Sequence, residues 1–174
     1  MRGLLAGAVI AVLGFAGRDL RGAALGAPDV APKGIVSLEL AGTPEKAQRM
    51  LDLWAAGGKL NAARDSIGWD FGFIVLYGLT LLLWVWWARG RFSGRCWRRL
   101  GSAAIALVIA AAAADVAENV MLYGVFDDPT VAGTAWARRF AITKFGLIGA
   151  AVAYVLAVPI RLGLRRIRGT GQHP

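Results

Sequence analysis

The sequence predicts an all-α membrane protein: a bundle of four transmembrane helices with an amphipathic helix in the first extracytoplasmic loop. Its composition is unusually apolar, with 57% hydrophobic residues and a mean hydropathy of +0.54. The apolar residues gather in four blocks, at about 3–17, 68–88, 100–123 and 136–160. The last three exceed the roughly 20 residues needed to cross a hydrocarbon core of about 30 Å. Residues 1–174 are therefore expected to form a single membrane domain.

The first block is short and follows Arg2, as the apolar region of a secretory signal peptide does. The stretch Ala24-Leu25-Gly26 also resembles a small-residue cleavage site. Against cleavage, charged residues separate the block from that site, where signal peptides are usually neutral: Arg18, Asp19 and Arg21. These charges favour a retained, short membrane helix over a cleaved signal.

The extracytoplasmic loop is predicted to cover residues 18–67. Within it, Gly34–Gly42 alternates like a strand but has no partner strand, so an extended strap over the bundle is expected. Thr43-Pro44-Glu45 then indicates a helix start, with an N-cap, a proline at the first position and an acid in the first turn. An apolar stripe follows at helical spacing before Gly57-Gly58, and it predicts an amphipathic helix that caps the bundle: Ala47, Met50, Leu51 and Trp54.

The arginines indicate the orientation. Three stretches contain cations and no acid, and their members are Arg2, then Arg89, Arg91, Arg95, Arg98 and Arg99, then Arg161, Arg165, Arg166 and Arg168. Cations and acids nearly balance in the loop 18–67. The positive-inside rule then places both termini, the loop 89–99 and a basic tail at 161–174 in the cytoplasm. Tryptophans agree, with Trp84, Trp86, Trp87 and Trp97 at the cytoplasmic boundary and Trp69 and Trp136 at the outer one.

The basic residues predict contact with anionic membrane lipids and argue against a nucleic-acid partner, because their positions follow the topology. Cys96 is the only cysteine and His173 the only histidine, so disulfides within the chain, haem or zinc bound by histidine, and Ser-His-Asp catalysis are excluded. No cofactor or metal is predicted, and the oligomeric state stays open. Sixteen arginines against four lysines fit a GC-rich bacterial genome and hence a bacterial inner membrane.

Polar residues inside the apolar blocks form the candidate site. Asp115, Glu118 and Asn119 are spaced so that they share one face of a helix. Asp70 and Lys144 lie in the two neighbouring blocks, and Tyr77 shares the helix face of Asp70. At a rise of about 1.5 Å per residue, all are expected in the outer half of the membrane. Ionisable residues at such depth are costly and mark a candidate site.

The structural interpretation of this cluster is an ion-paired clasp, in which Lys144 pairs with Asp115 or Glu118. Asn119 would bond a backbone group or Asp70. Three acids exceed one lysine, so a proton or a rim arginine would balance the charge, with Arg64, Arg138 and Arg139 as candidates.

Three functional interpretations remain open beside the clasp. The cluster could bind a small cation, a lipid headgroup or another ligand. Alternatively, Asp115 and Glu118 could serve a small proton- or cation-coupled transporter. A hydrolase acting on a lipid-linked substrate is the least favoured, since no nucleophile, oxyanion-stabilising group or metal triad accompanies the acids. The predicted function is a non-enzymatic binding or accessory protein built round an outer-leaflet polar cluster.

Several short motifs also resemble an uncharacterised family of small four-helix bacterial integral membrane proteins. They are Leu38-Glu39-Leu40-Ala41-Gly42-Thr43 before a capped helix, Asp70, Asp115-x-x-Glu118-Asn119, and Lys144-Phe145. The resemblance implies a four-helix topology and no activity.

Overall fold

The computed structural model describes residues 25–170, and side chains as far as Arg161 apart from Pro159. This part of the chain is all-helical, with helices α2 (Ile35–Glu39), α3 (Pro44–Ala56), α4 (Leu60–Arg91), α5 (Arg95–Asp127) and α6 (Val131–Thr170). Within residues 25–170, three segments are long and apolar enough to cross a membrane: Leu60–Arg91, Arg95–Asp127 and Val131–Val158. The predicted helix at 3–17 lies outside the described residues, so the expected number of four spans is not tested.

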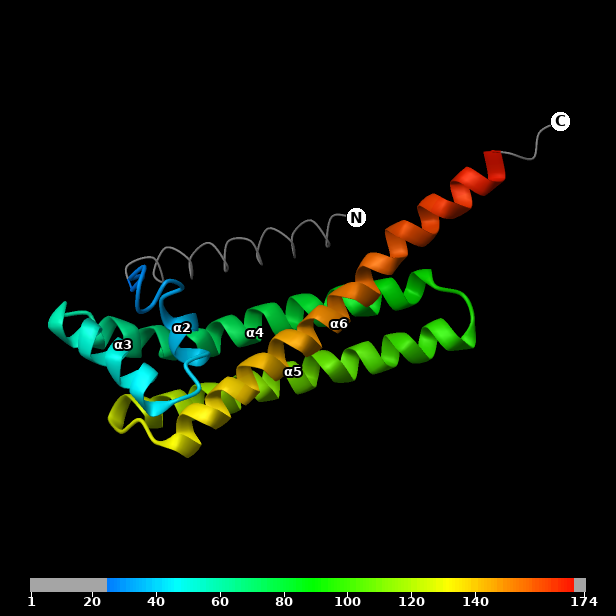
Figure 1. Ribbon diagram of the computed structural model, residues 1–174. Helices are drawn as coiled ribbons and strands as arrows, with labels where there is room; N and C mark the ends of the chain where they lie inside the picture. Colours follow the sequence, from blue (N-terminus) through cyan, green and yellow to red (C-terminus); the bar gives the residue numbers. More distant parts are fainter. Residues whose placement is uncertain (1–24, 171–174) are drawn as a thin grey trace.

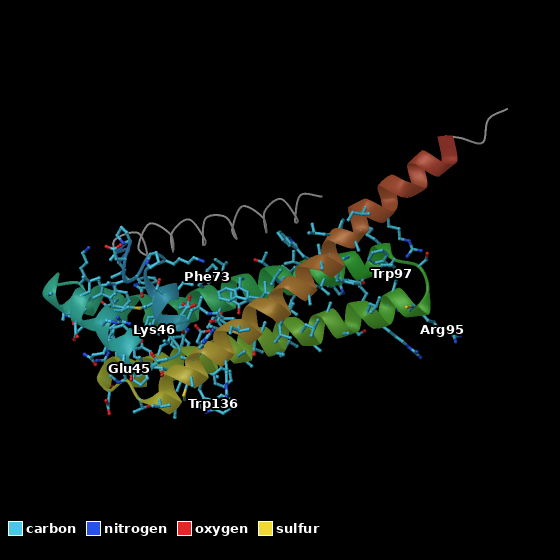
Figure 2. All side chains as sticks on the ribbon, viewed as in Figure 1. Glu45, Lys46, Phe73, Arg95, Trp97 and Trp136 are labelled. Atoms are coloured by element: carbon cyan, nitrogen blue, oxygen red, sulfur yellow. The ribbon has the colours of Figure 1, made fainter. Side chains whose placement is uncertain are left out.

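The three long helices lie side by side, with α5 packed against both α4 and α6 (Figure 1). α6 crosses the other two obliquely. The short helices α2 and α3 lie beside the start of α4 and the turn between α5 and α6; we call this the loop end. The opposite end, where α4 turns into α5 at residues 92–94, is the basic end. Figure 2 shows Arg95 and Trp97 at the basic end, and Glu45, Lys46 and Trp136 at the loop end.

The long helices extend beyond the predicted apolar blocks. α4 begins at Leu60 instead of 68, and α5 begins at Arg95 after Gly94, whose φ of 107° suits only glycine well. α6 continues to Thr170, so the helix extends beyond the apolar block predicted at about 136–160 and into the predicted basic tail. Leucine and arginine, which dominate residues 161–168, are both strong helix formers.

The prediction of an extended strap at Gly34–Gly42 is wrong, because Ile35–Glu39 is helical. A helix satisfies its backbone hydrogen bonds internally, whereas an isolated strand would leave them unpaired. The helical spacing turns Ile35, Leu38 and Glu39 to one buried face. At the start of this segment the backbone N–H of Lys33 donates to Ser37 Oγ at 3.0 Å.

α3 begins as the Thr-Pro-Glu sequence predicts. Thr43 is the N-cap, Pro44 is the first helical residue, and the Lys46 backbone N–H donates to Thr43 Oγ1 at 3.5 Å. A hydrogen bond from its own backbone, followed by one from Thr43, lowers the pKa of Glu45. The helix buries Trp54, whose indole N–H donates to the Leu25 carbonyl at 3.0 Å and whose ring stacks with Phe126. α3 is thereby fixed against the end of the bundle.

The described side chains form two apolar cores in the interior. One lies at the loop end and joins α2 and α3 to the long helices, through residues such as Leu38, Trp54 and Leu122. The other lies toward the basic end, around Val85 and Tyr154. Between them, a set of buried polar side chains crosses the bundle.

Candidate functional site

The buried polar side chains between the two cores form the candidate site, which we call the polar layer. Its members are Glu39, Asp70, Tyr77, Asp115, Glu118, Asn119 and Lys144, and all of them are buried. Asp70 lies about 15 Å along α4 from its first residue, Asp115 about 18 Å from the last residue of α5, and Lys144 about 20 Å from the start of α6. The three long helices therefore contribute at nearly the same depth from the loop end.

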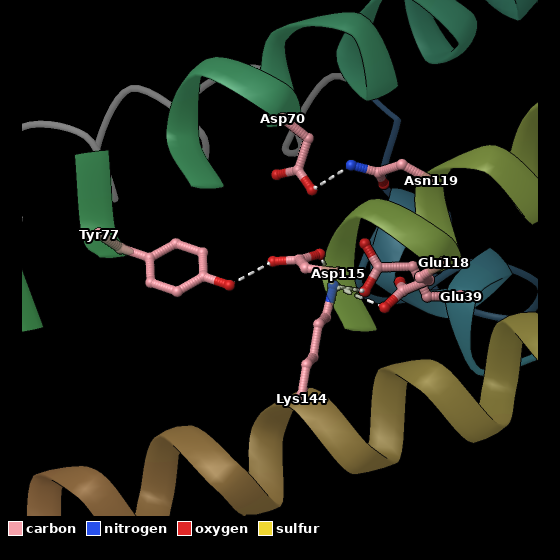
Figure 3. A network of polar contacts seen from close by, with 7 residues as sticks. All are labelled: Glu39, Asp70, Tyr77, Asp115, Glu118, Asn119 and Lys144. Carbon is pink, nitrogen blue, oxygen red and sulfur yellow. Dashed lines mark hydrogen bonds and ion pairs between the residues drawn. The ribbon is translucent and has the colours of Figure 1, made fainter. Parts of the chain in front are cut away.

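Lys144 is the centre of the polar layer. Its side chain rises from α6 toward a group of carboxylates, and only 1% of it is exposed (Figure 3). Nζ lies 2.7 Å from Asp115 Oδ1, 2.8 Å from Glu118 Oε2 and 3.5 Å from Glu39 Oε2. An unpaired ammonium at such burial would be very unfavourable, so these carboxylates are what allow a lysine to sit there.

Asp115 uses both of its carboxylate oxygens. Oδ1 accepts a hydrogen bond from Lys144, and Oδ2 accepts one from the Tyr77 hydroxyl at 2.9 Å. Asp115 thus connects all three long helices, because Tyr77 belongs to α4 and Lys144 to α6. Bonds of this kind, with an ionised partner in a dry interior, are stronger than neutral ones.

A second contact joins α4 to α5 on the loop-end side of the first. Asn119 Nδ2 donates to Asp70 Oδ2 at 3.1 Å (Figure 3). The six residues singled out from the sequence are therefore brought into one layer by the structure. Within that layer Lys144 lies within 3 Å of both Asp115 and Glu118, and Asn119 bonds Asp70.

Glu39 is the member that sequence reasoning missed. It is 2% exposed, and α2 brings its Oε2 to 3.5 Å from Lys144 Nζ. A signal for it was present in the sequence: Glu39 stands between two leucines, and a helical reading places it on one face with Ile35 and Leu38. The prediction of an extended segment placed Glu39 on the opposite face from Leu38, so this shared face was not recognised.

The three arginines considered as charge partners have other contacts. Arg64 forms an exposed ion pair with Asp127 at 2.9 Å. Arg139 stacks its guanidinium 4.9 Å above the ring of Trp136. The Arg138 side chain lies against Gly42, where a β-carbon would be only 2.7 Å from Arg138 Cδ. These contacts place all three arginines at the loop end, around the layer.

The polar layer offers ammonium, phenol, amide and carboxyl groups in a closed, packed interior. Among the residues that the structure describes, no group of His, Cys, Asp and Glu side chains is arranged to hold a metal ion. The ammonium of Lys144 occupies the point where the carboxylates converge, which is where a cation would bind. Glu118 Oε1 is buried and has no hydrogen-bond partner within the described part of the chain.

Comparison with protein-family models, with curated proteins and with solved structures gave no match to this chain.

Proposed function

We propose that the chain is a multi-pass protein of the bacterial cytoplasmic membrane with a binding or accessory role. We further propose that the polar layer is a clasp, which holds the outer segment formed by α2 and α3 against the long helices. The observation that supports this best is the position of Lys144, which pairs at once with Asp115 and Glu118 of α5 and with Glu39 of α2. The clasp would keep α2 and α3 ordered at the outer face, where a partner or ligand could bind.

The proposed orientation has the loop end outside and the basic end in the cytoplasm. The distribution of charge supports it, since the sequence contains no Asp or Glu at positions 71–114 or after Asp128. Five arginines lie between positions 89 and 99. Such an excess of arginine is typical of cytoplasmic loops. This places the C-terminus in the cytoplasm, and a retained span at 3–17, as the sequence predicts, places the N-terminus there too.

The clasp is tested at Glu39. We expect Glu39→Gln to accelerate backbone hydrogen exchange in residues 35–41 by about tenfold, because losing a charged contact to Lys144 removes about 1.5 kcal/mol. Hydrogen exchange read by mass spectrometry in detergent would measure it. Glu45→Gln is the matched control, since Glu45 is exposed on α3 of the same outer segment. Equal exchange in both variants would contradict the clasp.

The orientation is tested with the chain's own single thiol. Cys96 is exposed at the basic end, so a membrane-impermeant maleimide should label it in inverted vesicles and leave it unmodified in intact spheroplasts. In a Cys96→Ser background, Lys46→Cys should show the opposite pattern, because position 46 is exposed on α3. Labelling of Cys96 from outside would reverse the proposed topology.

Proton or cation coupling through Asp115 and Glu118 is the second candidate function. It is favoured by one specific observation, the buried Glu118 Oε1 that lacks a hydrogen-bond partner among the described residues. A buried polar atom of this kind in an apolar span marks a place where a proton or an ion could be exchanged. A hydrolase is less favoured, because a substrate would have to displace tightly packed side chains to reach the acids.

A further inference from the structure

The basic end contains a cavity of about 430 Å³ at the end of α4. Its lining combines guanidinium groups with aromatic rings: Trp86, Trp87, Arg89, Arg91, Phe92 and Arg98. It lies at the basic end of the long helices, whereas the polar layer lies between the two apolar cores, and none of its lining residues takes part in that layer. A different ligand chemistry is therefore needed to explain it.

The cavity is strongly and uniformly positive. Arg89, Arg91 and Arg98 supply three guanidinium groups, and acidic residues are missing from positions 71–114 and from 129 onward. Two of these arginines have fixed positions: Arg89 Nε donates to the Arg98 carbonyl at 3.4 Å, and the Arg91 guanidinium lies 4.9 Å above the Trp87 ring. Guanidinium groups held in place in this way are suited to an anion with several oxygen atoms.

Unused hydrogen-bond donors accompany these charges. The Trp87 indole N–H is buried and has no acceptor among the residues that the structure describes. Nη1 of Arg161 is likewise buried without an acceptor in the described part of the chain; Arg161 does not line the cavity, but its guanidinium packs 5.7 Å from the ring of Phe92, which does. Buried donors without acceptors are rare in folded proteins and point to a missing partner.

We propose that this cavity binds the phosphate group of an anionic lipid headgroup. A phosphate supplies a negative charge for the lining guanidinium groups and an acceptor oxygen for the Trp87 indole N–H. The aromatic wall favours a lipid over a soluble phosphate, because Trp86 is 69% exposed at the point where the apolar span meets the arginines. The lipid site depends on the proposed membrane insertion but not on the polar layer acting as a clasp. The lipid site and the clasp can therefore be contradicted independently of each other.

The test uses the full-length protein purified in detergent and titrated with phosphatidylglycerol or phosphatidylcholine, with native mass spectrometry to count bound lipids. We expect Arg91→Gln with Arg98→Gln to weaken phosphatidylglycerol binding about twenty-five-fold, at about fivefold per arginine. The matched control is Arg139→Gln, because Arg139 also stacks on a tryptophan at 4.9 Å but lies at the loop end. The control should bind phosphatidylglycerol like the unmodified protein.

Equal losses in the double variant and the control would overturn the proposed site, as would equal binding of the two lipids by the unmodified protein. A third arm adds inorganic phosphate at millimolar concentration. Displacement of phosphatidylglycerol by phosphate would overturn the lipid assignment in favour of a soluble phosphate ligand, and no displacement supports the lipid. Both arginines are exposed, so unchanged circular dichroism is expected for the double variant.

Discussion

Lys144→Met is expected to lower the free energy of unfolding by about 3–5 kcal/mol, because it removes the cation and leaves its buried carboxylates facing one another. Methionine keeps the length and most of the volume of lysine, so the loss arises from charge and not from a cavity. The three facing groups, Asp115, Glu118 and Glu39, lie 2.7 to 3.5 Å from Nζ. Thermal or denaturant unfolding in detergent, followed by circular dichroism, would measure the change.

The same substitution at an exposed site provides the control. Lys46 lies on the exposed side of α3, and Lys46→Met should change stability by less than about 0.5 kcal/mol. Adding Asp115→Asn and Glu118→Gln to Lys144→Met should restore part of the lost stability, since the unpaired charges are then removed. Equal stability of the Lys144 and Lys46 variants would contradict a central role for Lys144.

The long helices were predictable from the sequence because length and apolarity alone define them. The helical spacing of Asp115, Glu118 and Asn119 likewise fixed one face of α5, and counting residues placed Asp70 and Lys144 at a similar depth. These inferences need only the periodicity and rise of a helix. They do not depend on how the helices pack against one another.

Glu39 and α2 could not be predicted in the same way. Five residues from Ile35 to Glu39 are too few for a periodic signal to distinguish helix from strand. Their conformation is decided by burial against the bundle, where Leu38 and Glu39 are each 2% exposed. The continuation of α6 to Thr170 was not predicted for a related reason, because composition alone does not distinguish a basic helix from a basic tail. Which acids surround Lys144 likewise depends on tertiary packing.

The two acids of α5 should respond differently to removal of their charge. Asp115 accepts from both Lys144 and Tyr77, whereas Glu118 contacts Lys144 at 2.8 Å through one oxygen only. Each contact with a charged group contributes about 1.5 kcal/mol or more. The number of contacts therefore predicts a larger cost at Asp115, even though both side chains are fully buried on the same helix.

We expect Asp115→Asn to lower the free energy of unfolding by about 3 kcal/mol and Glu118→Gln by about 1.5 kcal/mol, measured by unfolding in detergent.

The same two variants in proteoliposomes distinguish the clasp from ion coupling. A clasp predicts no proton or cation flux in any form of the protein, because Lys144 fills the point where the carboxylates meet. Coupling predicts flux that Glu118→Gln abolishes while the protein stays folded, since Glu118 Oε1 is a buried oxygen without a hydrogen-bond partner among the described residues. Loss of flux in Glu118→Gln with retained stability would thus contradict the clasp and support a transport site. Absence of flux, together with a larger loss of stability in Asp115→Asn than in Glu118→Gln, would support the clasp.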